Sequence, residues 1–435
     1  MSKKFFIKTY GCQMNFYDSE RLRALLKREN FIEVSIPEEA DYIIVNTCSV
    51  RKHAEDRAIS FLSSLKNFKN NKKFCLVGCT PSLYREEIFK RYDFVDIICG
   101  PNSYKKFVEV LKNNFYDKKI GIFQEDMDLF NEILLPEIRG SSVSSFISIT
   151  KGCENFCSYC VVPYTRGKLI SKPVGIILEE IKKLVEKGIK EVILLGQNVN
   201  EYGKDNGENF VELLTKVHNI DGLLKIGFLT SHPKDISTDL INLFSELPKL
   251  YKHLHLPLQS GSNKILKLMN RKYSLEKYIE IVQRARNACP DISITSDIIL
   301  GFPYEDEKDF EQTYRVIEEI EFDDLYVFKY SPRPLTEANK FPDNVPKEEK
   351  EKRHRLILNL QDKISLLKNK KKEGKIDDVF IKKESYKKKN SYIGRTTNNK
   401  PVIVETEEKK LEGKIFKVKI EKGERHYLYG SIVRV

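Results

Sequence analysis

The sequence predicts an α/β protein in three parts: an N-terminal α/β domain with a parallel sheet, a central partial (β/α)6 barrel, and a small all-β, OB-like barrel. Strand-like and helix-like stretches alternate through the first two parts, which is typical of parallel sheets. The pattern then changes to short strands separated by turns, and the net positive charge is confined to the end of the chain. A length of 435 residues fits two to four domains, which we place at residues 3–120, 139–369 and 372–435.

Composition indicates a folded protein that does not enter a membrane. Hydrophobic residues make up 40% of the chain and aromatic residues 11%, which is enough to build cores. The apolar runs are strand-sized and fall far short of the ~20 residues of a membrane span. The first residues, Met1-Ser2-Lys3-Lys4-Phe5-Phe6-Ile7, lack the apolar segment and cleavage site of a signal peptide. We therefore expect a cytoplasmic protein.

In the N-terminal domain, three cysteines stand just beyond predicted strands. Strands joined by helices form a parallel sheet, and functional groups gather beyond the carboxyl ends of its strands. Cys12, Cys48 and Cys79 each follow a predicted strand by one or two residues. Strands are predicted at residues 5–10, 42–46, 74–78 and 94–98, with helices near 18–30 and over 51–68.

The chain has nine cysteines, and an odd number in a cytoplasmic protein favours metal or thiol chemistry over disulfides. We expect the three cysteines beyond the strands to meet at one sheet edge around a cluster. The alternative is three unrelated buried thiols. Cys99 also follows a predicted strand, so the geometry leaves it open, whereas Cys75 and Cys289 are most simply small buried hydrophobes.

The most specific motif is the C-x3-C-x2-C run formed by Cys153, Cys157 and Cys160. A structural zinc site normally has four protein ligands, and the nearest histidines along the chain, His53 and His218, are far away in sequence. An iron–sulfur cluster is held by thiolates, and three of them leave one iron open to a substrate or cofactor. The run therefore predicts an iron–sulfur site rather than a zinc site.

The central part predicts six β/α units, too few for a closed eight-fold barrel. Chemistry in such barrels lies at the carboxyl ends of the strands. The cysteine run follows the first strand, and Gly196-Gln197-Asn198, Ser231-His232-Pro233, Gln259-Ser260-Gly261-Ser262 and Gly301-Phe302-Pro303 follow others. Singly, each is more often turn chemistry, but together they form a ring around the cysteine loop. Predicted strands are 146–150, 191–196, 225–230, 253–258, 292–300 and 325–330; predicted helices are 174–187, 208–217, 235–247, 275–288 and 307–320.

The net charge of +12 arises entirely from residues 347–435, which hold 26 Lys and Arg against 14 Asp and Glu. A confined basic segment favours a polyanion such as nucleic acid, although a solvated basic face explains the charge equally well. Residues 346–374 predict a helix with an apolar stripe of Leu356, Leu360, Ile364 and Leu367. Beyond it, strands at 378–385, 392–395, 402–405, 414–420 and 427–433, with turns at Thr397-Asn398-Asn399 and Lys422-Gly423-Glu424, predict the small β-barrel.

These motifs resemble those of the radical S-adenosylmethionine (SAM) superfamily and, within it, the methylthiotransferase family. The resemblance covers essentially the whole chain. The C-terminal barrel resembles the TRAM domain, an RNA-binding module of tRNA-modifying enzymes. The matching segments are Thr9-Tyr10-Gly11-Cys12-Gln13-Met14-Asn15, Asn46-Thr47-Cys48-Ser49-Val50-Arg51, Val77-Gly78-Cys79, the loop from Gly152 through Cys160-Val161-Val162-Pro163-Tyr164-Thr165-Arg166-Gly167, Leu195-Gly196-Gln197-Asn198-Val199-Asn200, and Leu256-Pro257-Leu258-Gln259-Ser260-Gly261-Ser262.

The resemblance implies two 4Fe-4S clusters. One, on Cys153, Cys157 and Cys160, would bind SAM and cleave it to a 5′-deoxyadenosyl radical, which abstracts hydrogen from C2 of a modified adenine. The other, on the three N-terminal cysteines, would carry the methylated sulfur, with the methyl group taken from a second SAM. Implied partners are tRNA and an electron donor such as a flavodoxin-type reductant, acting on a monomer. The residues expected around SAM are Gly196, Gln197, Ser231 and Gln259.

Within the family, Gln13-Met14 is similar to the branch that methylthiolates N6-(dimethylallyl)adenosine beside the anticodon of tRNA. Leu335 departs from the family, which usually has Gly there. The alternatives are methylthiolation of another tRNA adenosine or of a ribosomal-protein aspartate. A rival of a different class is a non-catalytic iron–sulfur protein that binds RNA.

Overall fold

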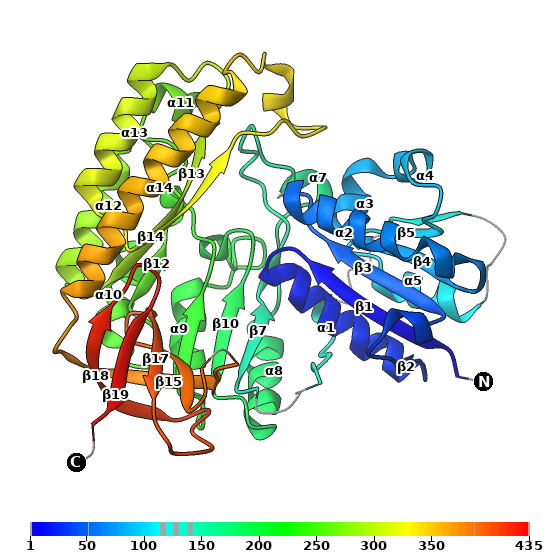
Figure 1. Cartoon of the computed structure of the whole chain (residues 1–435), viewed down its shortest axis with the longest axis horizontal. Coiled ribbons are helices and arrows are strands. Elements are labelled where there is room, and N and C mark those ends of the chain that lie inside the picture. The colour runs from blue at the N-terminus through cyan, green and yellow to red at the C-terminus, as the bar shows by residue number, and fades with distance from the viewer. Residues whose placement is uncertain are drawn as a thin grey trace.

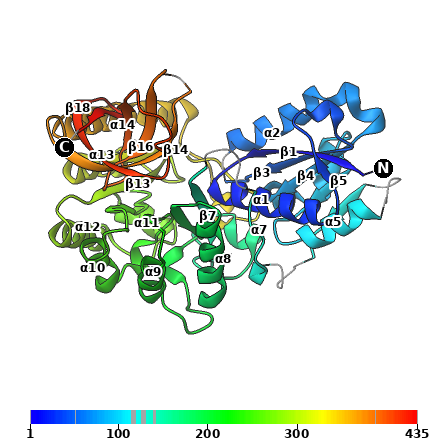
Figure 2. The same ribbon diagram turned by 90° about the horizontal axis from the view of Figure 1, so that it is seen from below.

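The computed structural model describes residues 2–50, 52–113, 119–124, 130–137, 142–386 and 388–433. It confirms the predicted fold class: a parallel α/β domain, a partial barrel of six parallel strands, and a closed β-barrel. The N-terminal domain lies beside the central domain, and the C-terminal barrel packs on the side of the central domain that is away from the N-terminal domain (Figures 1 and 2). The predicted boundaries at residues 139 and 435, and Arg51 at the start of a predicted helix, lie outside the described residues.

The N-terminal domain is a six-stranded parallel sheet with helices on both faces. One face packs against α1 (Gln13–Arg28) and α5 (Tyr104–Lys112), and the other against α2 (Lys52–Ser64), α3 (Cys79–Tyr84) and α4 (Glu87–Arg91). In spatial order the strands are β2 (Ile32–Glu33), β1 (Lys4–Tyr10), β3 (Tyr42–Thr47), β4 (Lys73–Gly78), β5 (Ile97–Cys99) and β6 (Ile120–Ile122).

Two predictions in this domain are wrong. Helix α1 begins at Gln13, not near residue 18, because Cys12 and Asn15 cap it reciprocally. Strand β5 extends to Cys99, so Cys99 lies within the strand rather than after it. Cys99 donates its thiol hydrogen to the carbonyl of Gly100, over 3.2 Å, in the core next to Cys75.

The central domain places six parallel strands in chain order. Two three-stranded sheets are joined where Ile226 pairs with Leu250, which closes the curve of the partial barrel. Helices cover its outside, and a single hydrophobic core fills the space between. The strands are β7 (Ser144–Ser148), β10 (Glu191–Leu195), β11 (Lys225–Phe228), β12 (His253–His255), β13 (Ser293–Leu300) and β14 (Asp324–Lys329); the main helices are α8 (Val174–Glu186), α9 (Phe210–His218), α10 (Thr238–Glu246), α12 (Leu275–Ala288) and α13 (Glu307–Ile320).

Helix α14 (Lys347–Lys370) packs along the central domain through Ile357, Leu360 and Ile364. The predicted apolar stripe is wrong at both ends, because Leu356 is 40% exposed and Leu367 is 61% exposed. The helix is followed by a closed barrel in the order β15 (Ile376–Glu384), β16 (Ser391–Arg395), β17 (Pro401–Glu405), β19 (Leu428–Ile432) and β18 (Ile415–Gly423). The turn predicted at residues 422–424 begins later, since β18 runs through Gly423.

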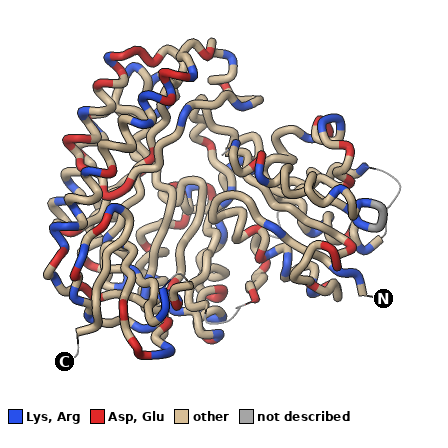
Figure 3. Tube along the Cα trace, viewed as in Figure 1, with Lys and Arg blue, Asp and Glu red and all other residues tan. Residues whose placement is uncertain are grey.

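The C-terminal barrel contacts the amino ends of the central strands. Lys252, just before β12, donates its backbone N–H to Thr397 O over 3.0 Å, and the Lys400 ammonium pairs with Asp323 over 2.8 Å. Along this part of the trace, Lys and Arg positions are interspersed with Asp and Glu positions (Figure 3). The barrel therefore lies at the opposite end of the strands from the cysteine loop. In the described part of the chain, no helix combines the length and apolar character needed to span a membrane.

Candidate iron–sulfur and cofactor site

The C-x3-C-x2-C loop follows β8 (Thr150–Lys151) and is fixed at both ends. Gly152 has φ +72°, and a Cβ there would lie 1.8 Å from Lys168 O, so only glycine fits. The backbone N–H of Cys153 donates to Gly167 O over 3.2 Å, and Ser158 Oγ donates to Leu268 O over 2.8 Å. The loop is thus a preformed holder for its three thiols.

Polar side chains support these thiols. Arg271 donates from its guanidinium to Cys157 Sγ over 3.3 Å, and Asn155 donates from Nδ2 to Cys153 Sγ over 3.4 Å. Burial is the main cause that raises the pKa of Cys153 to about 11 and that of Cys160 to about 12. Buried thiols of this kind become thiolates when a metal coordinates them, and the donors then stabilise the sulfur charge. An all-cysteine donor set with such support fits a 4Fe-4S cluster.

The second set of thiols is brought together from three strand ends. Cys12 lies two residues after β1 and caps α1. Cys48 directly follows β3, and Cys79 begins α3. A hydrogen bond with Cys48 is the main cause that lowers the pKa of Cys12 to about 6, and Cys79 acts electrostatically on Cys48. The structure therefore gathers the three predicted cysteines and leaves Cys99 out.

Asn15 and Asn46 tie the second set together. Asn15 Nδ2 donates to Asn46 Oδ1 over 2.9 Å, and Asn46 Nδ2 donates to Asn15 O over 3.0 Å. Asn15 Oδ1 also accepts from the Cys12 thiol over 3.2 Å. A Cβ on Gly11 would lie 2.5 Å from Asn15 Oδ1, so a larger residue before Cys12 would displace the Asn15 side chain.

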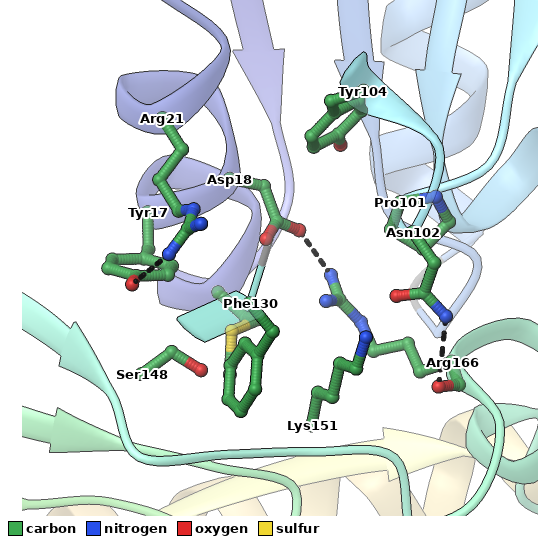
Figure 4. Close-up of a pocket in the computed structure, with 11 residues that line it drawn as sticks. Tyr17, Asp18, Arg21, Pro101, Asn102, Tyr104, Phe130, Ser148, Lys151 and Arg166 are labelled. Atoms are coloured by element: carbon green, nitrogen blue, oxygen red, sulfur yellow. Dashed lines mark hydrogen bonds and ion pairs between the residues drawn. The ribbon is translucent and has the colours of Figure 1, made fainter. Parts of the chain in front are cut away.

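The two sets lie at the two ends of one short helix, α7 (Val162–Arg166). Cys160 lies two residues before its first residue, and the helix packs against α3, which begins at Cys79. Burial raises the pKa of Cys79, and the charge of Arg166, the last residue of α7, opposes that rise. Arg166 also pairs with Asp18 of α1 over 2.7 Å, in a buried ion pair that joins the two domains (Figure 4). A second buried pair, Lys172 with Glu180, contacts α1 through Lys172 and the Tyr17 hydroxyl, 3.1 Å apart.

Within the described residues, no group of three or more His, Cys, Asp or Glu side chains is spaced to hold a single metal ion. A 4Fe-4S cluster places each thiolate on a different iron, which is a different geometry from a single-ion site. The donor chemistry and support of the two cysteine sets are therefore the observations that bear on clusters.

Polar atoms without a protein hydrogen-bond partner line the carboxyl ends of the central strands. Gln197 Oε1, Ser231 Oγ and Gln259 Oε1 are all buried and unsatisfied, and Gly196 approaches Thr150 so closely that a Cβ would lie 2.2 Å from its Oγ1. Buried polar groups are normally paired, so a ring of unpaired ones indicates a polar ligand. Other members of the ring are Thr150 Oγ1, Asn155 Oδ1, Asn198 Oδ1 and Asn200 Nδ2. This donor and acceptor set fits the polar groups of SAM.

Sequence reasoning did not single out several residues of the site. Asn15, Asn46 and Arg166 lie inside the motifs quoted for the cysteines, so their position was a usable signal. Arg271 stands 114 residues from the cysteine it contacts, and no local pattern marks it.

Comparison with protein families divides the chain in the same order as its domains. Residues 4–100 match the Uncharacterized protein family UPF0004, residues 147–317 the Radical SAM superfamily, and residues 370–433 the TRAM domain.

Two curated relatives match along nearly their whole length. The chain is 44% identical over 431 residues to a tRNA-2-methylthio-N(6)-dimethylallyladenosine synthase of Thermodesulfovibrio yellowstonii, covering 98% of both chains. It is 44% identical over 441 residues to the protein of that name from Caldicellulosiruptor saccharolyticus, covering 99% of this chain and 93% of the other. Among solved structures, the radical SAM methyltransferase TsrM of Kitasatospora setae shares the fold, with a TM-score of 0.59 at 10% identity over 78% of this chain and 74% of that one.

Proposed function

This chain belongs to the family of tRNA-2-methylthio-N(6)-dimethylallyladenosine synthases, and we infer that it methylthiolates C2 of N6-(dimethylallyl)adenosine beside the anticodon of tRNA. It is an enzyme of the radical SAM superfamily, which uses a 4Fe-4S cluster and SAM. The observation that carries the proposal is the placement of six cysteines in two sets at the two ends of α7.

In this proposal, Cys153, Cys157 and Cys160 hold the cluster that binds SAM. When bound, this cluster supplies the electron that cleaves SAM and so provides the radical that activates C2. The chain supports the thiolates through Arg271 and Asn155. We assign hydrogen bonding to SAM to Gln197, Ser231 and Gln259, because each has a buried polar atom without a hydrogen-bond partner in the protein. We assign close backbone approach to Gly196, because the space beside it is too small for a Cβ.

The second set, Cys12, Cys48 and Cys79, holds a second 4Fe-4S cluster in this proposal and carries the sulfur. The support is the gathering of three thiols from separate strands and the Asn15–Asn46 pair that fixes them. Because the helix between the two sets has only five residues, it would hold a sulfur carried by the second set close to the carbon activated at the first.

We assign tRNA holding to the C-terminal barrel, where exposed Lys and Tyr side chains interleave. The Lys383 ammonium lies over the Tyr386 ring, 5.5 Å from its centroid, and Tyr386 is 92% exposed. Such pairs stack on bases and contact phosphates. We further propose a cytoplasmic monomer that takes electrons from a flavodoxin-type donor.

The test is nucleoside analysis of tRNA from bacteria that lack their own enzyme and express this chain. We expect 2-methylthio-N6-(dimethylallyl)adenosine in place of its precursor, and none with Cys153→Ala. A methylthio group on another adenosine, or on a ribosomal-protein aspartate, would reassign the substrate. If the purified, reconstituted chain binds iron but does not cleave SAM, the chain is a non-catalytic iron–sulfur protein.

A further inference from the structure

Arg166 connects three features of the site: the helix α7, the N-terminal cysteine set and Asp18 of α1. It ends α7, which begins two residues after Cys160 and packs against α3, the helix that starts at Cys79. Burial raises the pKa of Cys79, and the Arg166 charge opposes that rise; the same charge adds to the lowering of the Cys12 pKa. Arg166 is 5% exposed, and it pairs with Asp18 over 2.7 Å (Figure 4). Its backbone carbonyl accepts from Asn102 Nδ2 over 3.3 Å, so both its main chain and its side chain are fixed.

A second cluster would bring three thiolates into largely buried surroundings. Cys48 is 1% exposed and Cys79 is 4% exposed, so solvent provides little compensation for their charge. The potential of an iron–sulfur cluster depends on its net charge, on hydrogen bonds to its sulfurs and on solvent exposure. Among the described residues, Arg166 is the buried cation on the helix packed against α3, and its charge acts on the pKa of both Cys79 and Cys12.

We propose that Arg166 is a positioning residue that sets the reduction potential of the second cluster, and that Asp18 moderates its effect. The inference rests on the proposed function, because it assumes that the N-terminal cysteines hold a cluster. A guanidinium offers several N–H donors in a rigid fork, so one donor can bond Asp18 while others face sulfur. The Asp18 carboxylate orients the fork and cancels part of its charge.

The proposal makes opposite predictions for the two partners of the ion pair. Arg166→Met removes the positive charge and the sulfur contact, so the potential of the second cluster shifts to a more negative value. Asp18→Asn keeps a hydrogen-bond partner of similar shape but removes the opposing charge, so the potential shifts to a more positive value. If the ion pair only held the two domains together, these two opposite shifts in reduction potential would not be expected.

The experiment uses the full chain with Cys153→Ala, Cys157→Ala and Cys160→Ala, which leaves only the N-terminal cysteine set. Iron and sulfide are quantified after anaerobic reconstitution, and the potential is measured by a redox titration followed by electron paramagnetic resonance. Arg166→Lys, which keeps the charge but loses the fork, is expected to shift the potential less than Arg166→Met. The matched control is Arg271→Met, a buried arginine at the other cysteine set, which is expected to leave the potential unchanged.

Shifts of opposite sign support the proposal. Shifts of the same sign, or no shift while four irons per chain remain, overturn it. If Arg166→Met loses its iron, the sign of the Asp18→Asn shift decides, and a negative or absent shift overturns the proposal. If the triple variant itself binds no iron while Arg166 is intact, the second cluster of the proposed function fails, and this inference fails with it.

Discussion

A Cβ on Gly78 would lie 2.4 Å from Asn46 Oδ1 and 2.8 Å from Thr47 O. The residue before Cys79 is therefore pressed against the amide that links the first two cysteine motifs. Gly78 also has φ +99°, which L side chains rarely adopt. Two independent constraints thus require glycine here, and both concern the alignment of the three N-terminal thiols.

Gly78→Ala is expected to lower the iron content of the N-terminal cysteine set, because relief of the clash displaces Asn46 and with it Asn15. Gly188→Ala is the matched control, since Gly188 has φ +96° but nothing within 4 Å of the added Cβ. Both variants strain the backbone to a similar degree, so the difference between their iron contents reports the effect of the clash alone. Both substitutions are made in the chain that lacks the Cys153, Cys157 and Cys160 thiols, and the iron bound per chain is measured. Equal iron content in the two variants would contradict the expectation.

Cys153→Ala and Cys48→Ala are expected to separate the two halves of the reaction. The first removes a thiolate of the SAM-binding set and abolishes SAM cleavage. The second leaves SAM cleavage but removes sulfur insertion into tRNA. The 5′-deoxyadenosine released and the methylthio-nucleoside formed are measured in one reaction, and full product from Cys48→Ala would refute the role of the second set.

Leu335→Gly is expected to stabilise the protein by about 0.5–1 kcal/mol. Leu335 has φ +67° and is 57% exposed, so the substitution relieves backbone strain and loses little packing. The contrasting control is Leu367→Gly, at an equally exposed position within α14, which is expected to cost about 1 kcal/mol. In urea titrations, the free energy of unfolding should therefore rise for Leu335→Gly and fall for Leu367→Gly. Destabilisation by Leu335→Gly would show that the backbone at Leu335 is not strained.

Acid is expected to destabilise the contact between the central domain and the C-terminal barrel through His253. Burial lowers its pKa to about 3 from the usual 6.5, and its ring lies between Thr295 Oγ1 at 3.0 Å and Asn399 Nδ2 at 3.2 Å. The unfolded chain binds this proton near pH 6.5 while the folded chain does not, so stability is lost as the pH falls below 6.5. The loss from this group is about 1.3 kcal/mol between pH 7.0 and 5.5.

His253→Gln keeps donor and acceptor capacity without titrating in this range. Urea unfolding of the apoprotein at both pH values measures the effect, with the variant compared with the parent. Between pH 7.0 and 5.5, the variant's free energy of unfolding should fall by about 1.3 kcal/mol less than that of the parent. Identical pH dependence in the two proteins would show that His253 does not contribute.

Tyr386→Ala is expected to weaken tRNA binding by about 1–3 kcal/mol if its ring stacks on one base. Its 92% exposure means that the fold does not depend on it. SAM cleavage in the absence of tRNA is the control and should be unchanged. Unaltered tRNA affinity in a filter-binding titration would remove Tyr386 from the RNA contact.

Local signals predicted much of the fold. Helices α12 and α13 begin and end where their patterns predict, because Ser274 and Asp306 accept the N–H groups of their first turns. The stripe on α14 was misplaced because hydrophobicity alone does not show which face packs. Leu356 and Leu367 lie outside the contact, while Gln361 lies inside it, donating to Phe322 O over 2.8 Å.

The candidate site divides in the same way. Spacing within a motif predicted the cysteines, whose position after a strand places them at one edge of a sheet. Arg271 reaches Cys157 from a distant part of the chain, and Arg166 meets Asp18 only because two domains pack together. Contacts of this kind depend on tertiary structure and leave no periodic trace in the sequence.

The position of the C-terminal barrel sets a minimum length for any RNA that it helps to present. The barrel contacts the amino ends of the central strands, whereas the cysteine loop stands beyond their carboxyl ends. Strands of five to eight residues, such as β7 and β13, rise about 3.3 Å per residue, which amounts to roughly 16–26 Å between the two ends. An RNA that is held by the barrel and modified beside the cysteine loop would have to span that depth, and a lone nucleoside is too short to do so.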